Sequence, residues 1–170
     1  SFASALVPLL VAIANADYLR HLYGEALQYT PIVGQLYVWI SGFAMFAFLI
    51  TLAREMVKDI EDITGDREME CRTAAIVWGE KVTKIVVSVL LIITMALIAY
   101  LVWAVLPFPS DWKSFSTRYA LFGLMVPILC AIALLWSAKS PLEYRRTQLI
   151  IKFAMFMGVM YSFVIQQNII

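Results

Sequence analysis

The sequence predicts an all-α integral membrane protein, a bundle of helices that crosses the bilayer several times. Hydrophobic residues make up 62% of the 170 positions and charged residues only 15%. The mean hydropathy is +0.83, whereas soluble domains are typically about half apolar and about one quarter charged. The apolar residues are gathered into long runs, and most of the charges lie between those runs. These features indicate that a bilayer surrounds most of the chain.

Five apolar stretches mark the expected spans. A helix needs about 20 predominantly apolar residues to cross the hydrocarbon core. The runs do not alternate polar with apolar residues, so they predict helices and exclude the strands of a membrane barrel. We place the spans near residues 2–16, 32–53, 85–106, 119–138 and 149–168. The first stretch is short and Ser1 lies directly in it, so we expect the sequence to start within a longer protein.

Three local signals refine the helix boundaries. Thr30 followed by Pro31 suits an N-cap and a first helical position before the second span. The sequence from Ser140 to Glu143 is typical of a capping box that starts a short lead into the last span. Pro127 either kinks the fourth span or is tolerated within it.

The basic residues alternate between rich and poor connections. Lys and Arg number one, six, two and four in the four successive connections between the spans. Because cytoplasmic loops collect basic residues, this pattern places the 54–84 and 139–152 connections in the cytoplasm and the C-terminus on the opposite side. The formal net charge is only +1, so no nucleic-acid partner is expected, since its phosphates would require a basic surface.

The 54–84 connection holds eight of the twelve acidic residues. Asp59, Asp62 and Asp66 are spaced i, i+3, i+7, so they would share one stripe of a helix that continues from the second span. Three carboxylates so close together would repel one another unless a cation neutralised them. Ligands that are all oxygens favour Mg²⁺ or Ca²⁺, and Mg²⁺ commonly combines a few carboxylates with the phosphates of a substrate.

Cations flank these aspartates. Arg54 and Lys58 lie one turn apart and suit the oxygens of a diphosphate. Gly65 is expected to end the regular helix just before Asp66. The remaining charges are interpreted as a solvated surface, because such runs commonly lie in water; they are Glu61, Glu68, Glu70, Glu80 and Lys81. Two interpretations stay open for Arg67 and Arg72, a role in the site or a place on the solvated surface, because cytoplasmic flanks collect Arg.

These residues carry a family resemblance. The connection contains the pattern Asp59-x-x-Asp62-x-x-Gly65-Asp66, followed by Arg72-Thr73 and Gly79. This pattern resembles the second aspartate-rich motif of the UbiA superfamily of intramembrane prenyltransferases. The preceding Arg54-Glu55-x-x-Lys58 looks like the digeranylgeranylglyceryl phosphate synthase-like branch. The family has nine transmembrane helices, and its motif joins the sixth and seventh on the cytoplasmic side. The resemblance therefore implies that residues 1–170 are the C-terminal part of one prenyltransferase domain, with its N-terminal part missing.

The resemblance also implies an activity. A polyprenyl group would be transferred from its diphosphate to a lipophilic acceptor, with membrane lipid around the enzyme. The transfer would be assisted by Mg²⁺ and would pass through an allylic cation. The acceptor is either a glyceryl-phosphate lipid or an aromatic or quinoid ring, and the lead-in from Arg54 to Asp59 favours the former. In this interpretation Asp59, Asp62 and Asp66 hold the metal and serve catalysis, while Arg54, Lys58 and Arg72 bind the diphosphate.

The chain departs from the family pattern at three points. Glu70 stands where Gly is common, and Ala74-Ala75 replaces the usual Leu-Pro. These two changes concern the shape of the loop. The first aspartate-rich motif of the family is absent from these 170 residues, because no further Asp follows Asp17 at the required spacing. We therefore expect the fragment alone to be inactive.

Three other interpretations stay open. A CDP-alcohol phosphotransferase would also use aspartates and a metal, but its pattern needs Asp-Gly where this chain has Asp62-Ile63. A non-enzymatic cation transporter fragment would favour acids within the spans, and the four longer stretches contain none. The chain could also be a catalytically inactive half.

Overall fold

The computed structural model describes residues 32–69, 71–105 and 115–169, with side chains over 38–69, 71–103 and 115–164. The expected span near 2–16 and the signal at Thr30 and Pro31 lie outside the described residues. Contacts divide the chain into two compact units, Ser1–Phe48 and Leu49–Ile170. The first long helix, α4 (Ile32–Glu61), begins in one unit and ends in the other. Within the first unit, Trp39 and Phe43 stack one turn apart with ring centroids separated by 6.3 Å.

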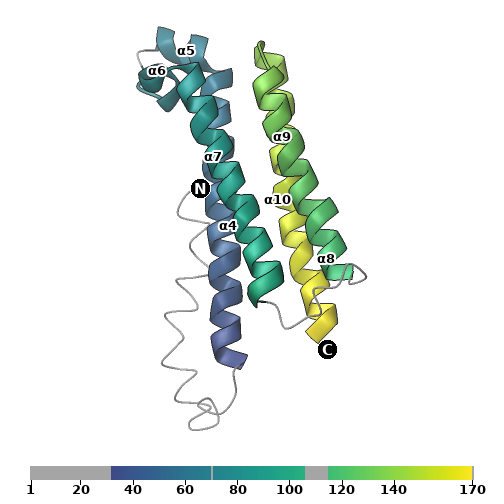
Figure 1. The fold of residues 1–170 in the computed structure, drawn as a ribbon. Coiled ribbons are helices and arrows are strands. Elements are labelled where there is room, and N and C mark those ends of the chain that lie inside the picture. The colour runs from purple at the N-terminus through teal and green to yellow at the C-terminus, as the bar shows by residue number, and fades with distance from the viewer. Residues whose placement is uncertain (1–31, 70, 106–114, 170) are drawn as a thin grey trace. The chain divides into compact units, whose positions relative to one another are not determined.

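The second unit is built from helices and short links over its described residues (Figure 1). The end of α4 is followed by two short helices, α5 (Ile63–Glu68) and α6 (Ala74–Trp78), and then by α7 (Glu80–Tyr100), which continues into the π-helical turn η1 (Leu101–Val105). The next span combines α8 (Phe115–Tyr119), the π-helical turn η2 (Ala120–Met125) and α9 (Val126–Ser137). The last helix is α10 (Pro141–Ile169). The expectation of an all-helical, multi-span fold is confirmed.

A narrow apolar seam holds α7, α9 and α10 together. Along α7 the buried positions recur every three or four residues, at Lys84, Val87, Leu91, Thr94 and Ile98. The same spacing buries Ile128, Ala131 and Leu135 on α9. This period turns one stripe of each helix toward its neighbours. The opposite faces expose large side chains such as Ile92, Leu129 and Phe156, as expected of helices that contact lipid rather than water.

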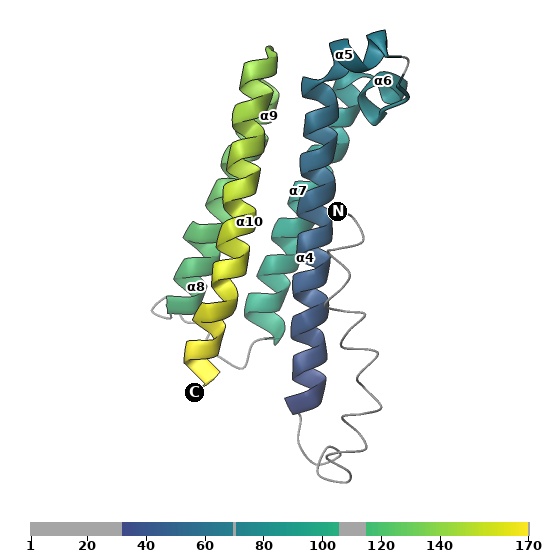
Figure 2. The ribbon, with the colours of Figure 1, turned by 180° about the vertical axis from the view of Figure 1, so that it is seen from behind.

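The capping box expected from the sequence lies at the turn between α9 and α10. Both views show the two helices side by side and antiparallel (Figures 1 and 2). The Glu143 carboxylate accepts hydrogen bonds from the backbone N–H groups of Lys139, at 2.6 Å, and Ser140, at 3.1 Å. These donors would otherwise be orphaned at the start of α10. The predicted helix start at residues 140–143 is therefore confirmed.

Four helical segments of the described residues are long and apolar enough to cross a membrane: Val38–Glu61, Glu80–Trp103, Phe115–Ser137 and Pro141–Val164. They match the four expected spans in this part of the chain. Each helix nevertheless extends beyond its expected limit, for example α4 to Glu61 rather than residue 53 and α10 from Pro141 rather than residue 149. The apolar runs mark only the segment that lies in hydrocarbon, whereas a helix continues into the polar interface.

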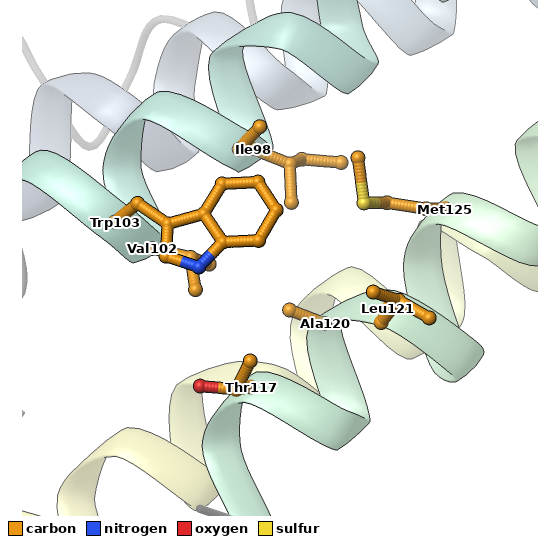
Figure 3. A pocket seen from close by; sticks show the side chains of 8 residues that line it. Ile98, Val102, Trp103, Thr117, Ala120, Leu121 and Met125 are labelled. Carbon is orange, nitrogen blue, oxygen red and sulfur yellow. The ribbon is translucent and has the colours of Figure 1, made fainter. Parts of the chain in front are cut away.

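The π-helical turns η1 and η2 face each other across a small apolar pocket at one end of the unit. Figure 3 shows Trp103 from the α7–η1 helix and Thr117, Ala120 and Leu121 from the α8–η2 helix around it. The cavity volume of about 10 Å³ is at the lower limit for one water molecule. Pro127 follows η2 near the start of α9, where the wider π turn accommodates its missing N–H and bulky ring.

Candidate functional site

Three of the expected site residues lie on the last two turns of α4. Arg54, Lys58 and Asp59 belong to α4, which ends at Glu61, and Asp62 forms the junction with α5. The junction is nearly helical: the N–H of Asp62 bonds the carbonyl of Lys58, and the N–H of Asp66 bonds the carbonyl of Asp62, both at 2.9 Å. Asp66 therefore lies on the first turns of α5. The expected continuation of the helix past residue 53 is present.

The helix boundary expected at Gly65 is wrong. Regular geometry is interrupted at Asp62, where φ is −91° and ψ is 4°, and α5 runs through Gly65 to Glu68. An Asp at this position favours a cap conformation. A helix tolerates Gly at a cost of about 1 kcal/mol, so Gly65 does not have to end it.

The three aspartates lie along one short stretch of chain, from the end of α4 through the junction to α5. Asp59 is half-buried, and the charges of Asp66 and Glu55 and the backbone of Ala74 at the start of α6 all act on its carboxylate. Asp62 is exposed at the junction between α4 and α5. Within the described residues, no three His, Cys, Asp or Glu side chains form a group that could hold a metal ion.

The donor chemistry nevertheless fits Mg²⁺ as part of a site. The carboxylates supply only oxygens, and Mg²⁺ is usually bound through one or two carboxylates plus substrate phosphates and water instead of a complete protein cage. Asp59 on α4 and Asp66 on α5 are the carboxylates that would serve in this way, and Asp62 lies on the turn that joins their helices.

The expected cations take different places around these aspartates. The Arg54 guanidinium lies 3.3 Å from the Glu55 carboxylate, and its buried Nε has no hydrogen-bond partner among the described residues. Lys58 is exposed one turn later. Arg72 is exposed in the link between α5 and α6, and no described contact ties it to the aspartates.

Hydrogen bonds within the connection, and between the connection and α7, fix its path. The N–H of Cys71 bonds the carbonyl of Asp66 at 2.9 Å. The buried hydroxyl of Thr83 donates to the carbonyl of Gly79 at 3.0 Å and approaches that of Ala74 at 3.4 Å. Gly79, part of the resemblance, has φ 81° and ψ 157°, a backbone region that is essentially restricted to glycine.

The sequence interpretation missed a set of polar contacts beside this connection. Glu61 and Glu80 were expected to be solvated, yet Glu61 accepts a 2.5 Å hydrogen bond from Gln148, and Glu80 accepts one of 2.6 Å from the Tyr144 hydroxyl. Lys84 is buried and pairs with Glu80 at 3.0 Å. The i, i+4 spacing of Glu80 and Lys84 was visible in the sequence. Nothing in the sequence indicated the pairing of Glu61 with a residue 87 positions away.

An open hollow lies on another side of α5. It is lined by Ile63, Thr64, Arg67, Glu68 and Glu80. None of the three aspartates belongs to its lining, so this hollow and the aspartates are separate features of the connection.

Several known proteins that are similar to this chain share one name. The chain is 33% identical to a digeranylgeranylglyceryl phosphate synthase of Methanosphaera stadtmanae over 128 residues, which cover 74% of this chain and 42% of the relative. It is 29% identical to the synthase of Thermococcus onnurineus over 151 residues, 88% of this chain and 49% of that one. These homologues are UbiA-type synthases, and the chain is similar to them over most of its own length.

A third relative with the same name matches over a longer segment. The Methanopyrus kandleri digeranylgeranylglyceryl phosphate synthase is 26% identical over 171 residues, 89% of this chain and 60% of the relative. The chain spans about half the length of the curated relatives it matches. No family model matches it, and no solved structure does. The family resemblance drawn from the aspartate motif is confirmed.

Proposed function

We propose that this chain supplies one side of the active site of a membrane prenyltransferase that transfers a prenyl group from its diphosphate to a glyceryl-phosphate acceptor. One observation carries the proposal. Asp59 lies on the last turn of α4, a helix long enough to span the membrane, and Asp62 and Asp66 follow just beyond that end, in a chain similar to digeranylgeranylglyceryl phosphate synthases. A charged diphosphate and an apolar tail could both be accommodated at such a boundary between water and lipid.

Asp59, Asp62 and Asp66 are the residues we propose to hold Mg²⁺. When bound, the metal supplies positive charge to the diphosphate oxygens and favours their departure. Arg54 and Lys58, on the turns before the aspartates, would bind the remaining oxygens. Arg72 would have to approach from the link between α5 and α6, and we assign it to the same diphosphate.

The proposed reaction breaks the bond between the allylic carbon and the diphosphate oxygen, whose electron pair leaves with the diphosphate. The acceptor hydroxyl then forms an ether bond to the allylic carbon and releases its proton to solvent. The residues of the chain bind and orient the diphosphate, while apolar helix faces hold the isoprenoid tail. Exclusion of water by these faces protects the cation from hydrolysis.

The cytoplasmic side is the proposed location of the connection. The 54–84 segment carries six basic residues, whereas the next connection along the chain carries only two. Because cytoplasmic connections collect basic residues, the 54–84 segment would face the cytoplasm. Tyr144 and Gln148, at the start of α10, lie against the same end of the unit, which agrees with one common side for both basic connections.

The test is product formation by the native protein that carries this chain, in lipid, with radiolabelled geranylgeranyl diphosphate. Parallel reactions would contain a glyceryl-phosphate acceptor, an aromatic acceptor or none, each with Mg²⁺ or with excess chelator. We expect a prenyl ether of the glyceryl-phosphate acceptor that disappears with chelator. Product with the aromatic acceptor alone would assign another substrate, and no product with either acceptor would refute prenyl transfer.

A further inference from the structure

We propose that Tyr144 and Gln148 of α10 are positioning residues that hold the two ends of the aspartate-bearing connection, residues 62–79. The inference rests on the proposed function for its catalytic consequence, but its structural part can be tested separately. It starts from where the two glutamates lie in the chain. Glu61 is the last residue of α4, directly before the connection, and Glu80 is the first residue of α7, directly after it.

Both glutamates are bound by the same helix. Gln148 donates to the Glu61 carboxylate at 2.5 Å, and the Tyr144 hydroxyl donates to the Glu80 carboxylate at 2.6 Å. Tyr144 and Gln148 are four residues apart, so they lie on one face of α10. Both are buried, with relative exposures of 4% and 7%. One stripe of α10 therefore binds the entry and the exit of the connection.

The first contact sets the rotation of the last turn of α4. Successive residues of a helix are turned by about 100°, so Glu61 points roughly 200° away from Asp59. A contact that fixes Glu61 toward α10 therefore fixes Asp59 on the other side of α4, toward Ala74 and Asp66. Loss of the contact would free the last turn of α4, which carries Asp59 and leads directly into Asp62.

The second contact is part of a larger polar network, in which Tyr144 and Lys84 are buried and Glu80 is exposed. Besides Glu80, the Tyr144 hydroxyl lies 3.0 Å from the carbonyl oxygen of Ala138. Lys84 also donates to this carbonyl, at 2.9 Å, and its ammonium lies 5.0 Å from the centre of the Tyr144 ring. The buried side chains of Tyr144 and Lys84 thus bind both Glu80 and the Ala138 carbonyl, and such shared polar contacts restrain the exit of the connection relative to α10.

The test combines hydrogen exchange with kinetics on the native protein in lipid. Gln148→Leu removes the amide that bonds Glu61, and Tyr144→Phe removes the hydroxyl that bonds Glu80 and the Ala138 carbonyl; both substitutions change the side-chain volume little. Ser162→Ala is the matched control, because the Ser162 hydroxyl bonds only the carbonyl of Val159 in its own helix among the described residues. We expect amide exchange across residues 62–79 to be several-fold faster than in the wild-type protein in both variants. The control should exchange at the wild-type rate. Apparent Mg²⁺ affinity should fall about ten-fold, as for other residues that orient metal ligands.

A swapped pair makes the test specific. Glu61→Gln combined with Gln148→Glu restores a carboxylate facing an amide, whereas Gln148→Glu alone places two carboxylates together. Recovery of slow exchange and of Mg²⁺ affinity in the double variant supports positioning, even if the single variants exchange faster everywhere. Unchanged exchange at 62–79 in both Gln148→Leu and Tyr144→Phe, or no recovery in the swap, would overturn it. If wild-type protein transfers no prenyl group, the proposed function fails while the exchange result still decides the positioning role.

Discussion

The ammonium nitrogen of Lys84 on α7 lies 2.9 Å from the carbonyl oxygen of Ala138, which follows α9. Lys84→Met keeps the length of the side chain but removes this hydrogen bond and the ion pair with Glu80. Loss of a buried charged hydrogen bond costs about 1–3 kcal/mol, so we expect a lower thermal unfolding midpoint in lipid. Lys81→Met is the control, because Lys81 is exposed on the same helix. Equal destabilisation by the two substitutions would contradict the assignment.

Gly79 and Gly65 offer a paired test of the connection. Gly79→Ala forces a side chain into φ 81°, a conformation that costs about 1–3 kcal/mol for other residues. Gly65→Ala should be neutral or stabilising, because Gly65 is helical with nothing within 4 Å of an added Cβ, and Ala favours helices by about 1 kcal/mol. The measurement is amide exchange of residues 74–83, which flank Gly79. Exchange there should be faster in Gly79→Ala than in Gly65→Ala. Greater loosening by the Gly65 substitution would show that the connection has a different backbone path.

Native Cys71 reports the sidedness of the connection. It is an exposed thiol between α5 and α6, so a charged, membrane-impermeant maleimide should label it in inverted vesicles but not in intact cells. Cys71→Ser should abolish this label, since Cys130 lies within a membrane-spanning segment that a charged reagent does not enter. Thr64→Cys provides a second probe on the same connection. Labelling of either residue from outside intact cells would refute the cytoplasmic assignment.

The 170 residues expressed alone should insert into membranes without transferring prenyl groups. They span about half the length of their curated relatives and carry one aspartate cluster, whereas the family resemblance implies two. A diphosphate carries about three negative charges, which metal ions and cations must neutralise together. The measurement is product formation by the purified 170 residues in lipid, compared with the native protein that carries them. Clear product from the 170 residues alone would make one cluster sufficient.

Much of the fold could be predicted because bilayer physics restricts it. The hydrocarbon core demands long apolar helices, and the long apolar runs, of which only the last contains a charged residue (Lys152), therefore located the four described spans. Their ends were predicted poorly, because a helix such as α10 continues into polar residues where hydropathy gives no signal. Capping chemistry did locate the start of α10, since the carboxylate of Glu143 and its backbone partners are neighbours in sequence.

The candidate site could be predicted only where its contacts are local. The spacing of Asp59, Asp62 and Asp66 marked the helical stripe, but the interruption at Asp62 depends on small changes in backbone angle. The pairing of Glu61 with Gln148 depends on how α4 and α10 pack in the second unit. A residue judged from its neighbours alone looks solvated when its partner is 87 positions away.

The substitution of single aspartates in the native protein tests the central claim most directly. Asp62→Asn and Asp66→Asn each remove one negative charge from the proposed metal-binding face while keeping the size of the side chain. Glu68→Gln makes the same change at an exposed position of α5 outside the proposed site. We expect both aspartate variants to lose turnover by a factor of about 100 or more, as when one stabilising group is removed from a reaction centre, with an unchanged unfolding midpoint. Near-normal turnover in both aspartate variants, equal to that of Glu68→Gln, would show that the connection is a solvated loop and not part of an active site.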